Sequence, residues 1–149
     1  MLMSQKQVVV VTLNDEFYGI NINYIKEVIK PKDVTVVPNS EDYVQGVINL
    51  RGKIIVVVDL DIRLGFKPPE NSDTTRVVVL DIDDEQVGLK VDSVIETIMV
   101  DRQNIQKPPE ALKKRVMVDV IEGVTRQDER LITLIDAKRL FPGSDKDGK

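Results

Sequence analysis

The sequence predicts a mainly β protein of the sandwich or barrel class, built from two related halves. Composition is the first reason: of 149 residues, 42% are hydrophobic, with 24 Val and 15 Ile against only 4% aromatic residues. Branched aliphatic side chains favour strands. The second reason is a series of short apolar runs separated by polar turns, and the third is an internal near-repeat. At this length folding removes about two-thirds of the unfolded surface from water, so a core forms without crosslinks.

The near-repeat defines the organisation of the chain. A shift of 69 residues aligns 8–29 with 77–98, and a shift of 77 residues aligns 44–60 with 121–137. The identical pairs include Val8 and Val77, Gly19 and Gly88, Glu27 and Glu96, Gly46 and Gly123, and Asp59 and Asp136. The two halves are therefore expected to fold alike.

We expect the whole chain, 1–149, to form one domain composed of these halves, 7–66 and 76–141. Residues 67–75 (KPPENSDTT) are polar and contain proline, so they are predicted to be the junction. Residues 143–149 are predicted to be a disordered tail.

Each half is predicted to begin with a hairpin. Apolar residues mark paired strands at 8–13 and 18–22 on either side of a polar turn, and the pattern recurs at 77–82 and 87–91.

A second hairpin in each half is predicted from the 77-residue repeat. In the first half it crosses Arg51-Gly52, where glycine can adopt the positive φ of a tight turn. Its counterpart crosses Asp128-Glu129 and has no glycine, so we expect that turn to differ or to be longer.

Only short helices are expected. Asn23 can cap a helical segment within 24–29 that carries Ile25 and Val28 on one face. Two further segments can each form one or two turns: 61–64 and 136–141.

Composition and charge disfavour several classes of function. The chain has no His and no Cys, so imidazole bases, thiolate nucleophiles and the usual zinc ligands are missing. Its 21 basic and 25 acidic residues give a net charge of −4, which disfavours nucleic acid as a partner. A barrel that stacks single-stranded nucleic acid on aromatic side chains is the alternative from another class. No apolar run reaches the length of a membrane helix, so we expect a cytoplasmic protein without direct membrane insertion.

Motifs that carry chemistry are absent or weak. The sequence contains no phosphate-binding glycine loop and no activated serine motif, so we expect no catalytic residue, cofactor or metal ion. One acidic string lacks the glycine and distal glutamate of a calcium loop and is interpreted as a hairpin tip: Asp81, Asp83, Asp84 and Glu85.

Asp59 and Asp61 form the only carboxylate pair that suggests an enzyme. Asp59 recurs as Asp136 at the end of a strand, where capping the following turn is the simpler role. We therefore favour capping and expect the two side chains to diverge.

Two features instead suggest an interaction surface. Leu50 stands beside Arg51 at a hairpin tip, where small polar residues are usual, and this indicates a surface docked against a partner. For the segment 24–29 two interpretations stay open: Ile25 and Val28 pack into the core, or they line an exposed groove.

Five motifs spread along the chain carry a resemblance: YGINI (18–22), EV (27–28), GVINLRGKI (46–54), VDL (58–60) and VGLKVDSV (87–94). Together they resemble the CheW family of bacterial chemotaxis coupling proteins, over about residues 7–141. The one visible departure is Val56, where the family often has proline.

The resemblance implies two SH3-like five-stranded β-barrels with a few short helices, one barrel per half, with an exchange of strands between barrels left open. It also implies a non-catalytic adaptor. Its partners are the cytoplasmic tip of methyl-accepting chemoreceptors and the regulatory domain of the histidine kinase CheA, in membrane-associated receptor arrays.

Site residues follow from the same resemblance. A receptor-binding groove between the barrels is expected to include Ile25, Val28, Gly46, Arg51 and Val91. The residues expected to face the kinase are Glu27, Pro108, Pro109 and Glu110.

Overall fold

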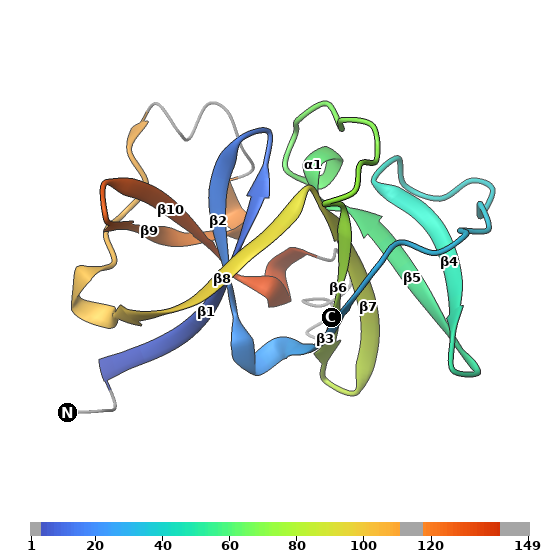
Figure 1. Ribbon diagram of the computed structural model, residues 1–149, viewed down its shortest axis with the longest axis horizontal. Coiled ribbons are helices and arrows are strands. Elements are labelled where there is room, and N and C mark those ends of the chain that lie inside the picture. The colour runs from blue at the N-terminus through green and yellow to red at the C-terminus, as the bar shows by residue number, and fades with distance from the viewer. Residues whose placement is uncertain (1–3, 111–117, 141–149) are drawn as a thin grey trace.

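The structure, a computed structural model, describes residues 4–110 and 118–140, which form two five-stranded sheets (Figure 1). The first has the order β8 (Ser93–Asp101), β1 (Gln5–Leu13), β2 (Glu16–Asn21), β10 (Arg130–Ile135) and β9 (Ile121–Gln127). The second has the order β3 (Ile25–Ile29), β6 (Arg76–Ile82), β7 (Glu85–Val91), β5 (Lys53–Asp59) and β4 (Val44–Leu50). The mainly β prediction is confirmed. The tail expected at 143–149 lies outside the described residues.

Each sheet closes into a small barrel through one β-bridge. In the first sheet, Gln106 bridges to Val124 and joins the segment after β8 to β9. In the second, Thr35 bridges to Val47 and joins the segment after β3 to β4. The first sheet is called barrel 1 and the second barrel 2. Within the two described segments, no helix is long and apolar enough to cross a membrane.

The barrels do not each contain one half, and the strand exchange left open above is what the structure shows: the halves exchange their N-terminal hairpins. Barrel 1 combines β1 and β2 of the first half with β8, β9 and β10 of the second. Barrel 2 combines β6 and β7 of the second half with β3, β4 and β5 of the first. The near-repeat contained no signal for this exchange, since a repeat shows which segments are alike and not which pair with one another.

Strand register supports the two-fold relation of the halves. Val8 pairs with Asn21 and Val77 with Lys90, so both hairpins keep the same alignment. The bulges also correspond: the ladder skips Lys26 in β3 and Ile95 in β8, which are equivalent under the 69-residue shift. Residues related by the 69- or 77-residue shift are therefore structural equivalents.

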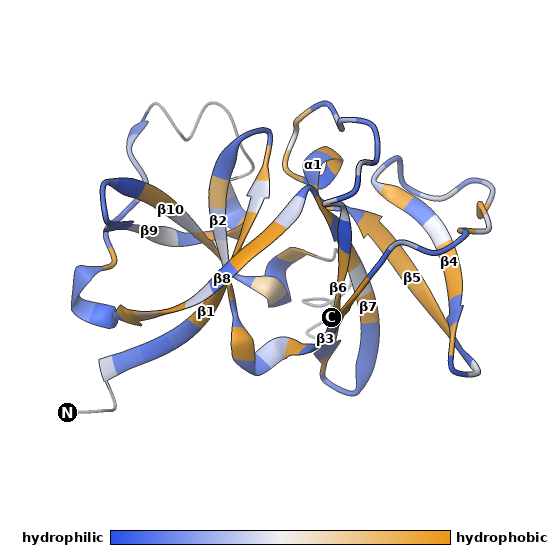
Figure 2. Cartoon of the chain, in the orientation of Figure 1, coloured by the Kyte–Doolittle hydropathy of each residue, from blue (hydrophilic) through white to orange (hydrophobic). Residues whose placement is uncertain are grey.

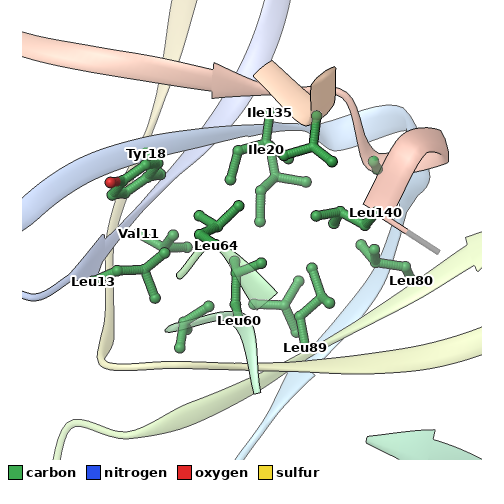
Figure 3. Close-up of a cluster of buried hydrophobic side chains, with 14 of the residues drawn as sticks. Val11, Leu13, Tyr18, Ile20, Leu60, Leu64, Leu80, Leu89, Ile135 and Leu140 are labelled. Carbon is green, nitrogen blue, oxygen red and sulfur yellow. The ribbon is translucent and has the colours of Figure 1, made fainter. Parts of the chain in front are cut away.

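Most of the core lies between the barrels. The largest cluster draws on both sheets and includes Tyr18, Ile20, Leu60, Leu89 and Leu140, as Figure 3 shows. Two smaller clusters fill the barrel interiors, around Ile132 in barrel 1 and around Ile55 in barrel 2. Figure 2 shows hydrophobic residues concentrated in the strands, β5 above all, and hydrophilic residues in many of the turns and loops. The two barrels therefore pack against each other through one shared apolar core.

All four hairpins turn in the same way. Asn14-Asp15, Arg51-Gly52, Asp83-Asp84 and Asp128-Glu129 each have positive φ at both turn residues, as type I′ turns require. The interpretation of the acidic string as a hairpin tip is confirmed.

The turn at Asp128-Glu129 neither differs nor lengthens, contrary to expectation. Gln127 pairs with Arg130 across the same two-residue loop that joins Leu50 to Lys53. The strand pairing on either side therefore holds Glu129 at φ 70°, although the residue has no glycine-like freedom there.

The helical segment expected within 24–29 is strand β3. Its β-branched residues pair with β6, so pairing with a distant strand overrides the local helical pattern. The helical turn in this region is η2 (Ile22–Tyr24), just before β3. It is capped by Asn21, whose Oδ1 accepts from the Asn23 N–H at 2.9 Å.

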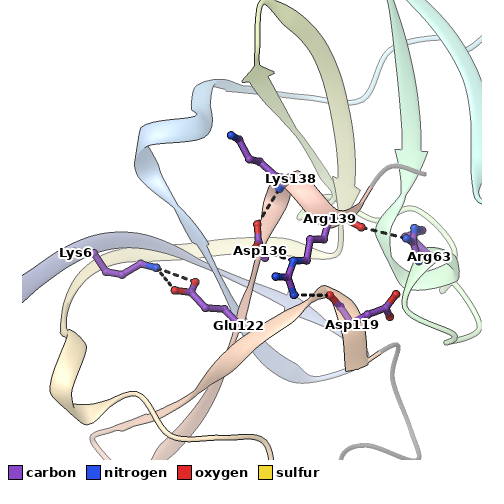
Figure 4. A network of polar contacts seen from close by, with 7 residues as sticks. All are labelled: Lys6, Arg63, Asp119, Glu122, Asp136, Lys138 and Arg139. Atoms are coloured by element: carbon purple, nitrogen blue, oxygen red, sulfur yellow. Dashed lines mark hydrogen bonds and ion pairs between the residues drawn. The ribbon is translucent and has the colours of Figure 1, made fainter. Parts of the chain in front are cut away.

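The other short helices agree with expectation. α1 (Leu60–Arg63) and η5 (Ala137–Leu140) lie in the two segments predicted to form turns. Two further single turns are η3 (Arg102–Asn104) and η4 (Val118–Val120). Arg63 of α1 donates to the Leu140 carbonyl at 2.5 Å, so α1 is tied to the last described helix. Figure 4 shows a second bond of Arg63, to the Arg139 carbonyl.

Candidate interaction surface

The principal candidate site is an ion pair at the end of barrel 2. Arg51, in the β4–β5 turn, pairs with Glu27 of β3, and the Arg51 side chain is 64% exposed. Ile29 packs in the interior of barrel 2, and alternation along β3 puts Glu27 on that same face. The turn is held by Asn49, whose Oδ1 accepts from the Gly52 N–H at 3.0 Å. A rigid turn thus presents the guanidinium to solvent.

Barrel 1 contains a similar ion pair in a more covered setting, although its arginine takes the position of Lys53 and the equivalent of Arg51 is Asp128. Glu96, the equivalent of Glu27, pairs with Arg130 in β10. The Arg130 guanidinium also lies over the Phe17 ring, 5.0 Å from its centroid, and its side chain is 22% exposed. The Arg130 guanidinium is therefore covered by the Phe17 ring, whereas most of the Arg51 side chain is accessible to a partner.

Three of the five expected groove residues lie in or beside the core between the barrels. Val91 is fully buried in the core between them, and Ile25 packs against its edge. Val28 is 40% exposed and pairs with Val78, a member of that core. Ile25 and Val28 therefore border the inter-barrel core, and Val91 supports it from beneath.

The other two groove residues lie elsewhere on barrel 2. Gly46 is buried in β4, where a Cβ would lie 2.1 Å from the Thr35 carbonyl oxygen at φ +148°. Its place in the fold is to let the closing bridge approach. Of Gly46 and Arg51, it is Arg51 that has an exposed side chain. Leu50 beside it is buried in the interior of barrel 2, so its apolar character serves the core.

The residues expected to face the kinase do not come together. Glu27 lies on barrel 2, whereas Pro108, Pro109 and Glu110 follow the Gln106 bridge on barrel 1. Pro109 and Glu110 are exposed and Pro108 is half-buried. The structure instead brings Glu27 to Arg51, two residues that the resemblance assigns to different partners.

Asp59 and Asp61, the carboxylate pair noted in the sequence, have different hydrogen-bond partners. Asp59 caps α1, accepting from the Ile62 N–H, and faces Lys90 at 3.4 Å, so the capping interpretation is confirmed. Asp61 turns to Asn14. Among residues 4–110 and 118–140, no group of three or more possible metal ligands converges.

One polar pocket of about 250 Å³ lies on barrel 1 and involves none of the expected site residues. It is lined by Lys6, Asn21, Tyr24, Arg102, Glu122, Ile135, Asp136 and Ala137. Lys6 and Glu122 pair there at 2.7 Å (Figure 4), so its buried cation is already neutralised.

Comparison with known proteins agrees with this architecture. A family model described as "CheW-like domain" matches residues 7–144. The chain belongs to the CheW-like family. It is 36% identical over 136 residues to the chemotaxis protein CheW of Bacillus subtilis, covering 91% of this chain and 86% of that protein. The chemotaxis protein CheW of Treponema pallidum is 32% identical and covers 92% of this chain and 82% of its own.

A solved structure shares the fold. The crystal structure of the scaffolding protein TtCheW from Thermoanaerobacter tengcongensis superimposes with a TM-score of 0.79 at 35% identity, covering 87% of this chain and 83% of that one. The family and the structural neighbour together indicate a scaffold of the chemotaxis type.

The sequence did not reveal the Glu27–Arg51 ion pair. The two residues are 24 positions apart in the chain, and no local pattern joins them. The available signal was the conservation of Glu27 as Glu96 in the near-repeat, together with a basic residue at each second hairpin.

Proposed function

We propose that the chain is a non-catalytic adaptor that couples methyl-accepting chemoreceptors to the histidine kinase CheA. The observation that carries the proposal is the match of a CheW-like domain to residues 7–144, joined to a structural neighbour described as a scaffolding protein. Absence of His and Cys from the sequence agrees with a role in recognition.

The receptor would bind at the border of the inter-barrel core. An amphipathic helix would cover Ile25 and Val28 and continue the apolar core that lies beneath them. Each Å² of apolar area buried in this way contributes about 25 cal/mol before the costs of association. Arg51 would contribute specificity at the rim through charge-assisted hydrogen bonds. Gly46 and Val91 would act indirectly, by holding the backbone and the core beneath this surface.

The kinase would contact two separate places. Glu27 is on barrel 2 and the Pro108-Pro109-Glu110 segment is on barrel 1, so one kinase domain reaching both must span the molecule, or two domains must each take one barrel. Two binding faces on one rigid core suit a scaffold. Because Glu27 pairs with Arg51, a partner that binds one of these side chains also alters the other.

Pull-down against a chemoreceptor cytoplasmic fragment and a CheA regulatory domain tests the proposal. The native chain is expected to bind both, and Arg51→Ala is expected to weaken receptor binding about tenfold, the effect of losing roughly 1.4 kcal/mol at an interface. Arg130→Ala is the matched control and is expected to leave receptor binding unchanged.

The outcomes separate the function from the site. A native chain that binds neither fragment would overturn the adaptor proposal. A native chain that binds both, with Arg51→Ala equal to Arg130→Ala, would leave the adaptor in place and remove Arg51 from the interface.

A further inference from the structure

Asp61 occupies a corner where three parts of the molecule meet. It belongs to α1 on barrel 2, and its Oδ1 accepts from the Asn14 Nδ2 at 2.7 Å, in the β1–β2 turn of barrel 1. Figure 1 shows α1 beside that turn. Asp92, in the link from β7 to β8, closes the corner, since its Oδ2 accepts from the Asn14 N–H at 2.8 Å.

Asp61 is buried in this corner without a neutralising cation. The residue is 1% exposed, and among the described residues no donor reaches its Oδ2. The groups acting on it are the carboxylates of Asp92 and Asp59 and the amide of Asn14. Lys90 faces the neighbouring Asp59 at 3.4 Å. An ionised Asp61 would thus leave a buried, unpaired oxygen next to a second carboxylate.

We propose that Asp61 carries a proton at neutral pH and donates it to Asp92, so that a shared proton fastens barrel 2 to barrel 1 at this corner. With Oδ2 protonated, the orphaned oxygen becomes a donor, and the neighbouring carboxylate of Asp92, held at the same Asn14, would accept from it. Asn14 then holds both carboxyl groups, one through its side chain and one through its backbone.

The titration behaviour agrees with this geometry. Burial, followed by the hydrogen bond and repulsion from Asp92, raises the pKa of Asp61 from 3.8 to about 8. The folded state therefore binds this proton up to about pH 8, and the unfolded chain releases it near pH 4. Since the folded state holds more protons in that window, stability from this group is complete below pH 4 and is lost as the pH rises to about 8.

The equivalent corner of the other half provides an internal control. Asp83 and Lys138 are the equivalents of Asn14 and Asp61, and they form an exposed ion pair at 3.9 Å with side chains 75% and 50% exposed. The two opposite charges there neutralise each other and are screened by solvent. No proton is needed to close that corner.

Urea unfolding of the full chain between pH 5 and 9 tests the proposal. Asn at position 61 reproduces the protonated form, with Nδ2 donating to Asp92 and Oδ1 accepting from Asn14. The folding equilibrium constant of the native chain, divided by that of Asp61→Asn, is expected to fall at least tenfold between pH 5 and 7 and to level off above about pH 8. The ratio to the control variant Asp83→Asn is expected to stay constant.

A flat ratio for Asp61→Asn over this range would overturn the proposal. Carboxyl ¹³C NMR of the native chain decides it even if the variant does not fold. One aspartate resonance, assigned to Asp61, is expected to report the protonated form at pH 7, and a resonance already shifted to the ionised form at pH 6 would contradict a shared proton.

Discussion

The two halves of the molecule share a backbone and differ in how they hold equivalent charges. In barrel 2 Arg51, which pairs with Glu27, is 64% exposed, whereas in barrel 1 the arginine that pairs with Glu96 stands at the position of Lys53, is 22% exposed and lies over Phe17. At the corners the relation reverses: Asp61 is buried with Asn14, whereas Lys138 and Asp83 are exposed. Register, bulges and turns are common to both halves, so these differences arise from side chains alone.

The comparison of the two halves separates features that both barrels need in order to close from features that one barrel alone has. Equivalent glycines, bulges and bridges recur because each barrel needs them to close. Closure does not require an arginine at position 51, because the equivalent residue in the other half is Asp128, and this makes Arg51 the more informative residue. Substitutions at equivalent positions therefore separate the two roles.

The largest effect is expected at the glycines that admit the closing bridges. In Gly46→Ala the new Cβ meets the Thr35 carbonyl at 2.1 Å with φ +148°, so a loss of about 3 kcal/mol in the free energy of unfolding is expected. In Gly123→Ala the nearest atoms are Ile105 Cγ2 at 2.6 Å and the Gln106 carbonyl oxygen at 2.8 Å, so a loss of about 2 kcal/mol is expected.

Urea denaturation of both glycine variants measures this difference. Equal losses would show that the positive φ at Gly46 adds no strain, and the two closures would then be energetically alike.

A smaller effect is expected for the two arginines. Arg130→Ala removes an ion pair and a stacked guanidinium, so the free energy of unfolding is expected to fall by about 1 kcal/mol. Arg51→Ala removes an exposed ion pair and is expected to cost less than about 0.5 kcal/mol. Thermal unfolding of the two variants checks the order. An Arg51→Ala variant that loses more stability than Arg130→Ala would make Arg51 a structural residue.

The smallest effect is expected in the β9–β10 turn. Glu129 has φ 70° where the equivalent turn has Gly52 at φ 87°, so Glu129→Gly is expected to relieve strain and to raise stability by about 0.5 kcal/mol. A higher midpoint in thermal unfolding is the expected readout. A lower midpoint would mean that the Glu129 side chain makes a contact worth more than the strain.

The repeat and the hairpins were predictable because they depend on local patterns. Continuous apolar runs defined β1 and β6, and alternating apolar residues defined β2 and β7. The recurrence of Asp59 as Asp136 led correctly to its capping role. β3 was missed because its five residues also fit a helix, and only its pairing with β6 decides between the two. The sequence left the hairpin exchange open and did not decide it, since the exchange depends on contacts between segments far apart in the chain.

The candidate site was predictable in part. The resemblance named Arg51 and Glu27, yet their pairing depends on the fold of barrel 2 and appeared only in the structure. Val91 and Gly46 lie in motifs of the family, and their burial indicates that such motifs combine residues for folding with residues for binding. The buried carboxyl of Asp61 had no signal in the sequence, because its partners Asn14 and Asp92 are 47 and 31 positions away.

Simultaneous binding of both partners tests the scaffold role most directly. A CheA regulatory domain is immobilised, and a labelled chemoreceptor cytoplasmic fragment is added with and without the chain. We expect the receptor fragment to be retained only when the chain is present, and Arg51→Ala to reduce that retention while Arg130→Ala does not. If the chain bound each partner alone but the receptor fragment displaced it from the kinase domain, the two faces would overlap and the scaffold account would be contradicted.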